Sequence, residues 1–275
     1  MVFREADFPY MSLADLRSTL PFQAKGMIPL PIEESELDFV PLSVVDDEQN
    51  GKQLHGILVA TCAVVWKTAY TAEEAGFVIT SIDAGPFALA RLFSDTNQAQ
   101  TEAVVNINGN CTDVIVLNNG KPAYMRVVPS GADDVSDAIA NALSISFEDA
   151  ERIKNQIGLQ NVTGDERLEK AEEVIRETTA QLIVGIRNTL NMYDVDHVDS
   201  TISGIILTGT GARLIGLPQC WQAPSTRWCA LAIRSSASKL SKEVERQNIV
   251  VHAVDLGGCW DWSSERSRGE CDYET

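Results

Sequence analysis

Residues 103–154 constrain the fold most, because they alternate three short apolar segments with tight turns before reaching helical sequence. Segments 103–107, 113–117 and 123–128 are predicted as strands. Asn119 and Gly120 predict a hairpin between the last two, since both residues tolerate the positive φ of a two-residue turn. A helix is expected after Ser130 and Gly131, so this stretch is predicted to form an antiparallel three-stranded unit leading into a helix.

The first turn of this unit is a candidate phosphate-binding loop with the sequence Asn108-Gly109-Asn110-Cys111-Thr112. Successive backbone N–H groups in such a turn can point outward together and surround an anion. Asn and Gly are also common in ordinary hairpin turns, so a plain turn is the alternative interpretation.

A second helix is predicted from Phe147, with Ser146 as its N-cap and Asp149 three residues later in a capping-box arrangement. Glu151 and Lys154 are spaced to lie on one face of this helix. Farther along, 205–208 is predicted as a buried strand that runs into the turn Gly209-Thr210-Gly211-Ala212-Arg213. A glycine-rich turn lets a ligand approach the backbone closely.

In this order, a hairpin phosphate loop, a Glu-x-x-Lys helix and a strand with a glycine-rich turn resemble the second half of an actin-like ATPase. In detail the chain resembles the PilM family of type IV pilus assembly, from about residue 8 to Leu217. Four segments carry the resemblance: MIPLPIEE at 27–34, NINGNCT at 106–112, FEDAERIK at 147–154 and TGTGARLIGL at 208–217. It implies an α/β fold in which a small α+β inserted subdomain precedes an actin-like, ribonuclease H-type domain.

Some positions depart from the family pattern. The second phosphate loop of the family reads aspartate–isoleucine–glycine, and here Asn106 and Asn108 take the outer two places. An amide at Asn106 cannot be the anion that orients a magnesium-bound water. Thr210 separates Gly209 from Gly211, and the family's N-terminal strand pair with its first phosphate loop has no counterpart before Met1.

The resemblance implies ATP with Mg²⁺ as the cofactor, held by residues from all three segments. The β- and γ-phosphates would be lined by Asn108, Gly109, Asn110, Cys111 and Thr112, through backbone N–H groups and the Thr112 hydroxyl. Glu151 and Lys154 would contact the ribose and the adenine edge. The base and α-phosphate would be wrapped by Gly209, Thr210, Gly211 and Arg213. No catalytic or metal-ligating side chain is assigned, and we expect at most a weak ATPase.

The function implied is a cytoplasmic scaffold of the inner-membrane pilus or secretion platform, peripheral to the membrane through its partners. It would hold the N-terminal peptide of a PilN-like membrane protein and contact other pilus assembly proteins, with impaired ATP binding. Two alternatives stay open. One is another actin-like protein such as an FtsA-like division protein, and the other is a sugar-kinase-like enzyme, which would need an acidic base where Asn106 stands.

Residues 1–95 are predicted as the inserted subdomain, on the partner-binding side. A helix should begin after Ser12 and be interrupted near Pro21, and an extended proline-containing connector should lead into an edge strand at 37–40. We then expect a polar turn at 45–52, a strand at 55–61, a helix at 62–75 ended by Gly76, a strand at 77–82 and a helix from Pro86 to Phe93. Polar residues 94–102 mark the domain boundary.

The second half of the actin-like domain is assigned to 103–217, including a long amphipathic helix at 167–193. Residues 218–275 form an atypical tail with four cysteines and four tryptophans: Cys220, Cys229, Cys259, Cys271, Trp221, Trp228, Trp260 and Trp262. A shifted reading frame or a separate C-terminal module would each explain this change. If the frame is shifted, we expect no packed core after Leu217. The charged end is expected to be disordered, and 237–247 and 249–254 are the candidates for a helix and a strand.

The formal net charge of −17 indicates no extended basic surface, which argues against nucleic acid binding. The N-terminus has no signal-peptide core and no stretch reaches the length of a membrane span, so the six cysteines are expected to be reduced thiols in the cytoplasm. The cysteine spacings do not match a zinc site. The acidic segment around His197 does not match a calcium loop.

Overall fold

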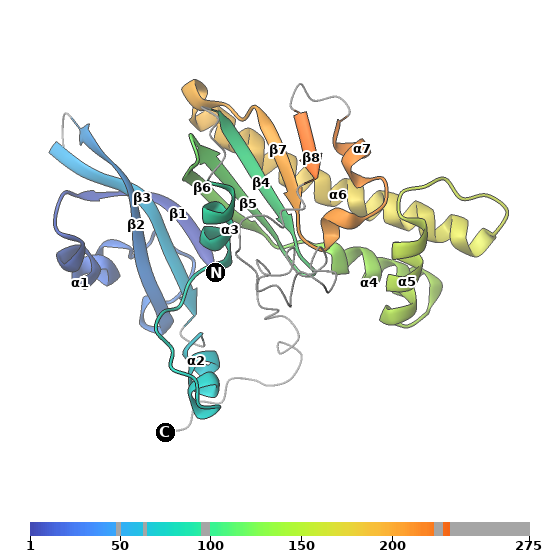
Figure 1. Ribbon diagram of the computed structural model, residues 1–275, viewed down its shortest axis with the longest axis horizontal. Coiled ribbons are helices and arrows are strands. Elements are labelled where there is room, and N and C mark those ends of the chain that lie inside the picture. Colours follow the sequence, from blue (N-terminus) through green and yellow to red (C-terminus); the bar gives the residue numbers. More distant parts are fainter. Residues whose placement is uncertain (48–50, 63–64, 95–99, 223–227, 232–275) are drawn as a thin grey trace, which may run out of the picture.

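The computed structural model describes residues 1–47, 51–62, 65–94, 100–222 and 228–231. Its strands form two separate sheets, one of three strands and one of five (Figure 1). The long helix α6 (Glu166–Asp196) crosses behind the larger sheet and extends toward the helices α4 and α5. No helix among the described residues is long and apolar enough to cross a membrane.

The three-stranded sheet is antiparallel, with β3 (Gly51–Cys62) between β1 (Val2–Pro9) and β2 (Ser35–Asp47). Both neighbours pair with β3 along most of its length, which gives this small sheet a continuous ladder. Strand β1 was not predicted from the sequence, although its residues Phe3, Ala6 and Phe8 are buried. The sequence signal for this strand is weak, because the segment is short and charged residues separate its apolar ones.

Helix α1 (Leu13–Gln23) covers one face of this sheet, with Leu16 and Leu20 buried against Phe8 and Phe39. The helix begins after Ser12, as predicted, and the Ser12 hydroxyl caps it by accepting from Asp15 N at 3.2 Å. Pro21 lies inside the last turn, where the helix continues only to residue 23. The proline-containing connector ends in a short 3₁₀ turn, η1 (Ile32–Glu34), before β2, which is an edge strand as expected.

Several predicted boundaries in this part were wrong. Strands β2 and β3 extend into the expected turn at 45–52, of which 48–50 lie outside the described residues. Cys62 ends β3, and helix α2 begins at Val65 (Val65–Glu74). The strand expected at 77–82 is irregular chain, because Phe77, Val78 and Ile82 are exposed and pair with no other strand of the described part. Helix α3 (Gly85–Phe93) matches its prediction.

The five-stranded sheet has the order β6-β5-β4-β7-β8. Its members are β4 (Thr101–Ile107), β5 (Thr112–Asn118), β6 (Lys121–Val128), β7 (Gly204–Thr208) and β8 (Trp228–Leu231). Strands β4 to β6 are antiparallel, whereas β7 runs parallel to β4 and β8 runs parallel to β7. The predicted hairpin is confirmed, with φ of 51° at Asn119 and 74° at Gly120.

Helices cover both faces of this sheet. On one face α6 buries the predicted stripe of Leu182, Ile186 and Leu190 against β4, β5 and β7. On the other face α3 packs with β1 and β3, so that Phe3 contacts the Phe87 ring edge-on at 5.9 Å between centroids. The second sheet is therefore joined to the first through a shared hydrophobic core. Helices α4 (Ala132–Leu143) and α5 (Phe147–Ile157) pack on the N-terminal part of α6.

The described chain stays packed beyond Leu217, contrary to the expectation for a shifted reading frame. Helix α7 (Leu217–Gln222) places Trp221 in the core below α6 with only 1% of its surface exposed, and β8 adds a parallel strand to β7. The Arg187 guanidinium lies 5.9 Å from the centroid of the Trp221 ring. The helix and strand expected at 237–247 and 249–254 lie outside the described residues.

Replacing Trp221 should test whether α7 is part of the folded core. Trp221→Ala removes a fully buried ring and leaves a cavity, so we expect the free energy of unfolding to fall by about 3–5 kcal/mol in urea denaturation. The neighbouring Cys220 is exposed, and Cys220→Ala is the control expected to change stability by less than about 0.5 kcal/mol. Equal stability of the two variants would contradict this packing.

Candidate functional site

Three backbone turns meet at one end of the larger sheet. Strands β4 and β7 are parallel with Asn106 opposite Thr208, so the turns that follow them lie side by side. A Cβ on Gly209 would lie 2.3 Å from Ile107 O, and a Cβ on Gly211 would lie 2.4 Å from Ile107 Cγ2. Only glycine fits at this approach, and Gly209 also has a φ of +91° that other residues rarely adopt. The structure thus brings the two predicted glycine turns together.

The N-terminus of α4 closes this site from a third side. Ala132 N donates to Asn108 O and Asp133 N donates to Gly109 O, both at 2.8 Å. A Cβ on Gly131 would lie 2.1 Å from Gly109 O, which excludes any larger residue there. We call the backbone of residues 108–112, 131–133 and 209–211 the cradle. Two N–H groups at the N-terminus of α4 therefore donate to loop carbonyls and not to a ligand.

A buried carboxylate organises the loop from below. Asp113 is 0% exposed, and its Oδ2 accepts hydrogen bonds from Asn106 Nδ2 at 3.0 Å and Asn108 Nδ2 at 3.1 Å. The two asparagines that depart from the family pattern therefore donate to one acid on the neighbouring strand. Hydrogen bonds from both amides offset the cost of burying a carboxylate. Sequence reasoning missed Asp113, although the hairpin register that places it opposite Asn106 could have indicated it.

The other loop residues differ in their accessibility. Thr112 is 0% exposed and its hydroxyl donates to Ser130 O at 2.8 Å, whereas Asn110 and Cys111 are partly exposed. Thr210 and Arg213 are exposed at the far turn, where η3 (Gly211–Arg213) begins. The cradle thus presents mainly backbone and small side chains to solvent, and the Thr112 hydroxyl is engaged inside the protein.

Lys154 lies behind the cradle. Its Nζ donates to Ser136 Oγ at 2.7 Å and to Ala132 O at 3.0 Å, so it ties α5 to the first turns of α4. Burial lowers the pKa of the Lys154 ammonium, and the nearby Glu151 and Asp133 carboxylates partly oppose that shift. Glu151 itself is exposed. Of the predicted Glu-x-x-Lys pair, the structure places one residue in the interior and one at the surface.

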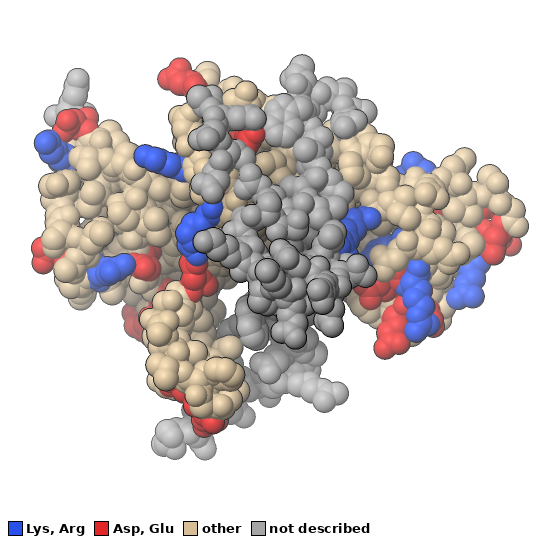
Figure 2. Space-filling view, viewed as in Figure 1, with Lys and Arg blue, Asp and Glu red and all other residues tan. Residues whose placement is uncertain are grey.

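Metal binding by protein groups alone finds no support in the described ranges, where no three His, Cys, Asp or Glu side chains gather in a suitable group. On the face shown in Figure 2, basic side chains stand singly or beside acidic ones. The described residues on that face form no continuous positive surface for a nucleic acid backbone.

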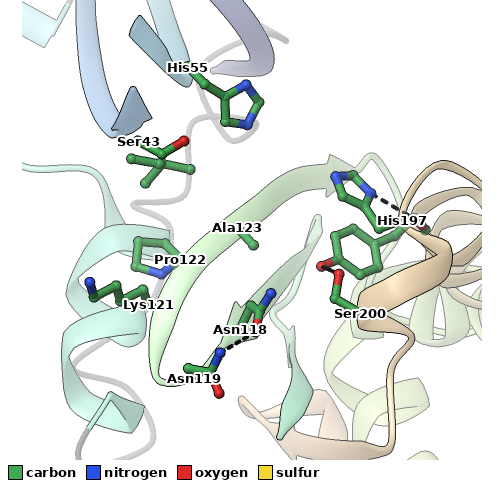
Figure 3. A pocket seen from close by; sticks show the side chains of 11 residues that line it. Ser43, His55, Asn118, Asn119, Lys121, Pro122, Ala123, His197 and Ser200 are labelled. Carbon is green, nitrogen blue, oxygen red and sulfur yellow. Dashed lines mark hydrogen bonds between the residues drawn. The ribbon is translucent and has the colours of Figure 1, made fainter. Parts of the chain in front are cut away.

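A separate cavity of about 340 Å³ lies where the two sheets adjoin. Figure 3 shows Ser43 and His55 of the small sheet facing Pro122 and Ala123 of β6, with His197 across the cavity at the end of α6. The His197 ring stacks on Tyr193 at 4.2 Å, and Tyr193 OH lies 3.2 Å from Ser200 Oγ. None of the predicted nucleotide-site residues lines this cavity.

Ionisable groups from the small sheet and from the end of α6 gather beside this cavity. His197 Nε2 lies 3.6 Å from Glu5 Oε2, and His55 Nδ1 lies 2.8 Å from Asp7 Oδ1. Burial raises the pKa of the Glu5 carboxyl, while His197 and His55 lower it and Asp196 and Asp7 raise it further. A raised pKa means that the folded chain holds the Glu5 proton more tightly than the unfolded chain does.

The stability contributed at Glu5 should therefore be present at low pH and lost as pH rises through the raised pKa. Glu5→Gln stays neutral, so we expect its stability relative to the parent protein to be greater at pH 7 than at pH 4. Urea denaturation at both pH values measures this difference. Glu177→Gln removes the same charge from an exposed position on α6 and serves as the control. A Glu5→Gln difference independent of pH would refute this assignment.

The sequence matches a known protein family over most of its length. The profile of a family described as type IV pilus assembly protein PilM matches residues 10–256. The match extends past Leu217, the point at which the recognisable family motifs end. The cell division protein FtsA of Bacillus subtilis is 26% identical over 162 residues, which cover 54% of this chain and 36% of FtsA. The chain thus spans about a third of the length of this curated relative.

Solved structures show the same fold. The PilM–PilN type IV pilus biogenesis complex aligns with a TM-score of 0.72 and 24% identity, covering 93% of this chain and 74% of that chain. MreB5 of Spiroplasma citri bound to ADP aligns with a TM-score of 0.50 and 15% identity, covering 71% of this chain and 65% of that chain. The actin-like α/β fold expected from the sequence is confirmed by these alignments.

Proposed function

Because the chain belongs to the PilM family of type IV pilus assembly proteins, we propose that it is a scaffold of the pilus assembly platform. In this role it sits on the cytoplasmic side and reaches the membrane through the N-terminal peptide of a PilN-like partner. The family match over residues 10–256 is the observation that carries this proposal. The related structure of a PilM–PilN complex supports the choice of partner.

Exposed apolar side chains favour a peptide-binding role for the N-terminal part. On α2 and the irregular chain after it, Trp66, Tyr70, Phe77, Val78 and Ile82 are between 42% and 87% exposed. Exposed apolar side chains that gather in one stretch of chain can mark a protein contact. The Trp66 indole is fixed by a 2.5 Å hydrogen bond from Nε1 to Glu36 Oε1, so one member is already held in place. The peptide would pack on this surface of residues 65–82.

In this proposal nucleotide binding is secondary to binding of the partner peptide. The glycines of the cradle let its three turns pack closely against one another, and a turn of this kind can present backbone N–H groups to a phosphate chain. The chemistry for turnover is weaker, because the amides of Asn106 and Asn108 are engaged with the buried Asp113 carboxylate. ATP with Mg²⁺ would supply a bound anion that stabilises the cradle, and the chain's own residues would position it rather than split it. We therefore propose weak nucleotide binding with at most slow hydrolysis.

The peptide contact can be tested by titrating a synthetic N-terminal peptide of a PilN-like protein into the full chain. We expect binding by calorimetry, and Tyr70→Ser should weaken it roughly tenfold because an exposed aromatic anchor is removed. Phe22→Ser is the matched control, since Phe22 is 82% exposed but lies on α1, away from α2 (Figure 1).

Nuclear magnetic resonance shifts on peptide addition should fall within residues 8–95. Shifts confined to residues 103–217, or equal weakening by both substitutions, would contradict the proposed surface. No detectable binding by the parent chain would refute peptide capture altogether.

A further inference from the structure

The end of α6 contacts the first strand of the small sheet through two side chains that can each carry a charge. His197 Nε2 lies 3.6 Å from Glu5 Oε2, and 28% of the His197 side chain and 27% of the Glu5 side chain are exposed. The second carboxyl oxygen, Glu5 Oε1, is buried and makes no hydrogen bond with any described residue. The contact lies beside the cavity between the two sheets, which His197 itself lines (Figure 3).

The other ring nitrogen of His197 determines where the hydrogens of this ring lie. Nδ1 is 3.1 Å from Tyr193 O, and a carbonyl oxygen only accepts, so Nδ1 carries a hydrogen. The imidazole also stacks on the Tyr193 ring, with 4.2 Å between centroids and 12° between planes, which holds it in this orientation. A neutral imidazole has one N–H and one lone pair. His197 Nε2 therefore presents a lone pair to Glu5 unless a second proton is present.

We propose that Glu5 and His197 form a proton-dependent latch, in which one proton held between the two side chains keeps the end of α6 against β1 and its loss releases it. With this proton, either an imidazolium faces a carboxylate or a neutral imidazole accepts a hydrogen bond from a carboxylic acid, and both pairs attract. Without it, a lone pair faces a carboxylate across a mostly buried contact, which is repulsive. Histidines ordinarily titrate between pH 5 and 8, so the latch should respond in or just above that range.

The groups around Glu5 act on this proton from both sides of the contact. Burial raises the pKa of the Glu5 carboxyl, and four neighbours modify that shift: His197 and His55 lower it, whereas Asp196 and Asp7 raise it further. Lys121 of β6 lines the same cavity. A raised pKa at Glu5 lets the pair keep its proton to higher pH than an exposed carboxyl would.

A second histidine–carboxylate pair nearby lacks this dependence on the proton. His55 Nδ1 lies 2.8 Å from Asp7 Oδ1, and the pair joins the neighbouring strands β3 and β1. A neutral His55 ring can place its hydrogen on Nδ1 and donate it to Asp7. This contact therefore persists when the ring loses its second proton, which makes Asp7 a matched control for Glu5.

Amide hydrogen exchange at the end of α6 tests the latch on the full chain. His197 N donates to Tyr193 O at 2.9 Å and Ser200 N donates to His197 O at 3.0 Å, so both amides report release of this segment. In the parent protein their protection factors should be about threefold lower at pH 8.5 than at pH 6, because the contact is a partly exposed ion pair. The amide of Ile186, in the middle of α6, should keep the same protection factor at both pH values.

Two substitutions of Glu5 should have opposite effects on these amides. The side-chain amide of Glu5→Gln can donate to the Nε2 lone pair, so His197 and Ser200 should stay protected at both pH values. Glu5→Ala removes the partner of the ring, so the lower protection should appear at both. Asp7→Asn changes the other pair and should respond to pH as the parent does.

Equal protection of His197 and Ser200 at the two pH values in the parent would overturn the inference. So would a pH response of Glu5→Gln like that of the parent, full protection in Glu5→Ala, or loss of the response in Asp7→Asn. Long-range ¹H–¹⁵N magnetic resonance spectra of the histidine rings give an independent readout. The neutral His197 ring should carry its hydrogen on Nδ1, and a hydrogen on Nε2 would contradict the latch.

Discussion

The site depends on one constraint, the close approach of three backbone segments at glycines. Gly131 and Gly109 lie so near each other that a single methyl group on Gly131 would collide with the opposite carbonyl. Gly209 and Gly211 approach the end of β4 in the same way. These contacts are possible because β4 and β7 are adjacent parallel strands whose turns emerge at one edge. Helix α4 then completes the cradle with hydrogen bonds to the loop carbonyls.

Electrostatics distinguish this cradle from a simple anion site. Asp113 is buried beneath the loop and Asp133 stands against it, while the nearby ammonium of Lys154 is hydrogen-bonded to α4. Asp113 accepts hydrogen bonds from both asparagine amides and Lys154 donates to Ser136 and Ala132 O, so these two charged groups are engaged within the protein.

Local sequence predicted the elements whose signals are local. Asn119 and Gly120 gave the hairpin because the required φ values belong to those residues, and Ser146 gave the start of α5 because its hydroxyl caps Asp149 N. The strand expected at Phe77 was wrong, since an apolar alternation forms a strand only when a neighbouring strand supplies hydrogen bonds. Asp113 and Lys154 were missed or misplaced because their partners come from other elements, which residue type alone does not reveal. The burial of Trp221 was not predicted for the same reason, because composition does not reveal that this ring packs in the core beside α6.

Amide hydrogen exchange at Ala132 and Asp133 tests the central claim most directly. Both N–H groups donate to loop carbonyls, so they should exchange about as slowly as amides of the β4 core, although first-turn helix amides usually exchange fast. Gly131→Ala should push α4 away from the loop and accelerate exchange at these two amides, while β4 stays protected. Fast exchange at Ala132 and Asp133 in the parent protein, or unchanged exchange in Gly131→Ala, would show that α4 does not close the cradle.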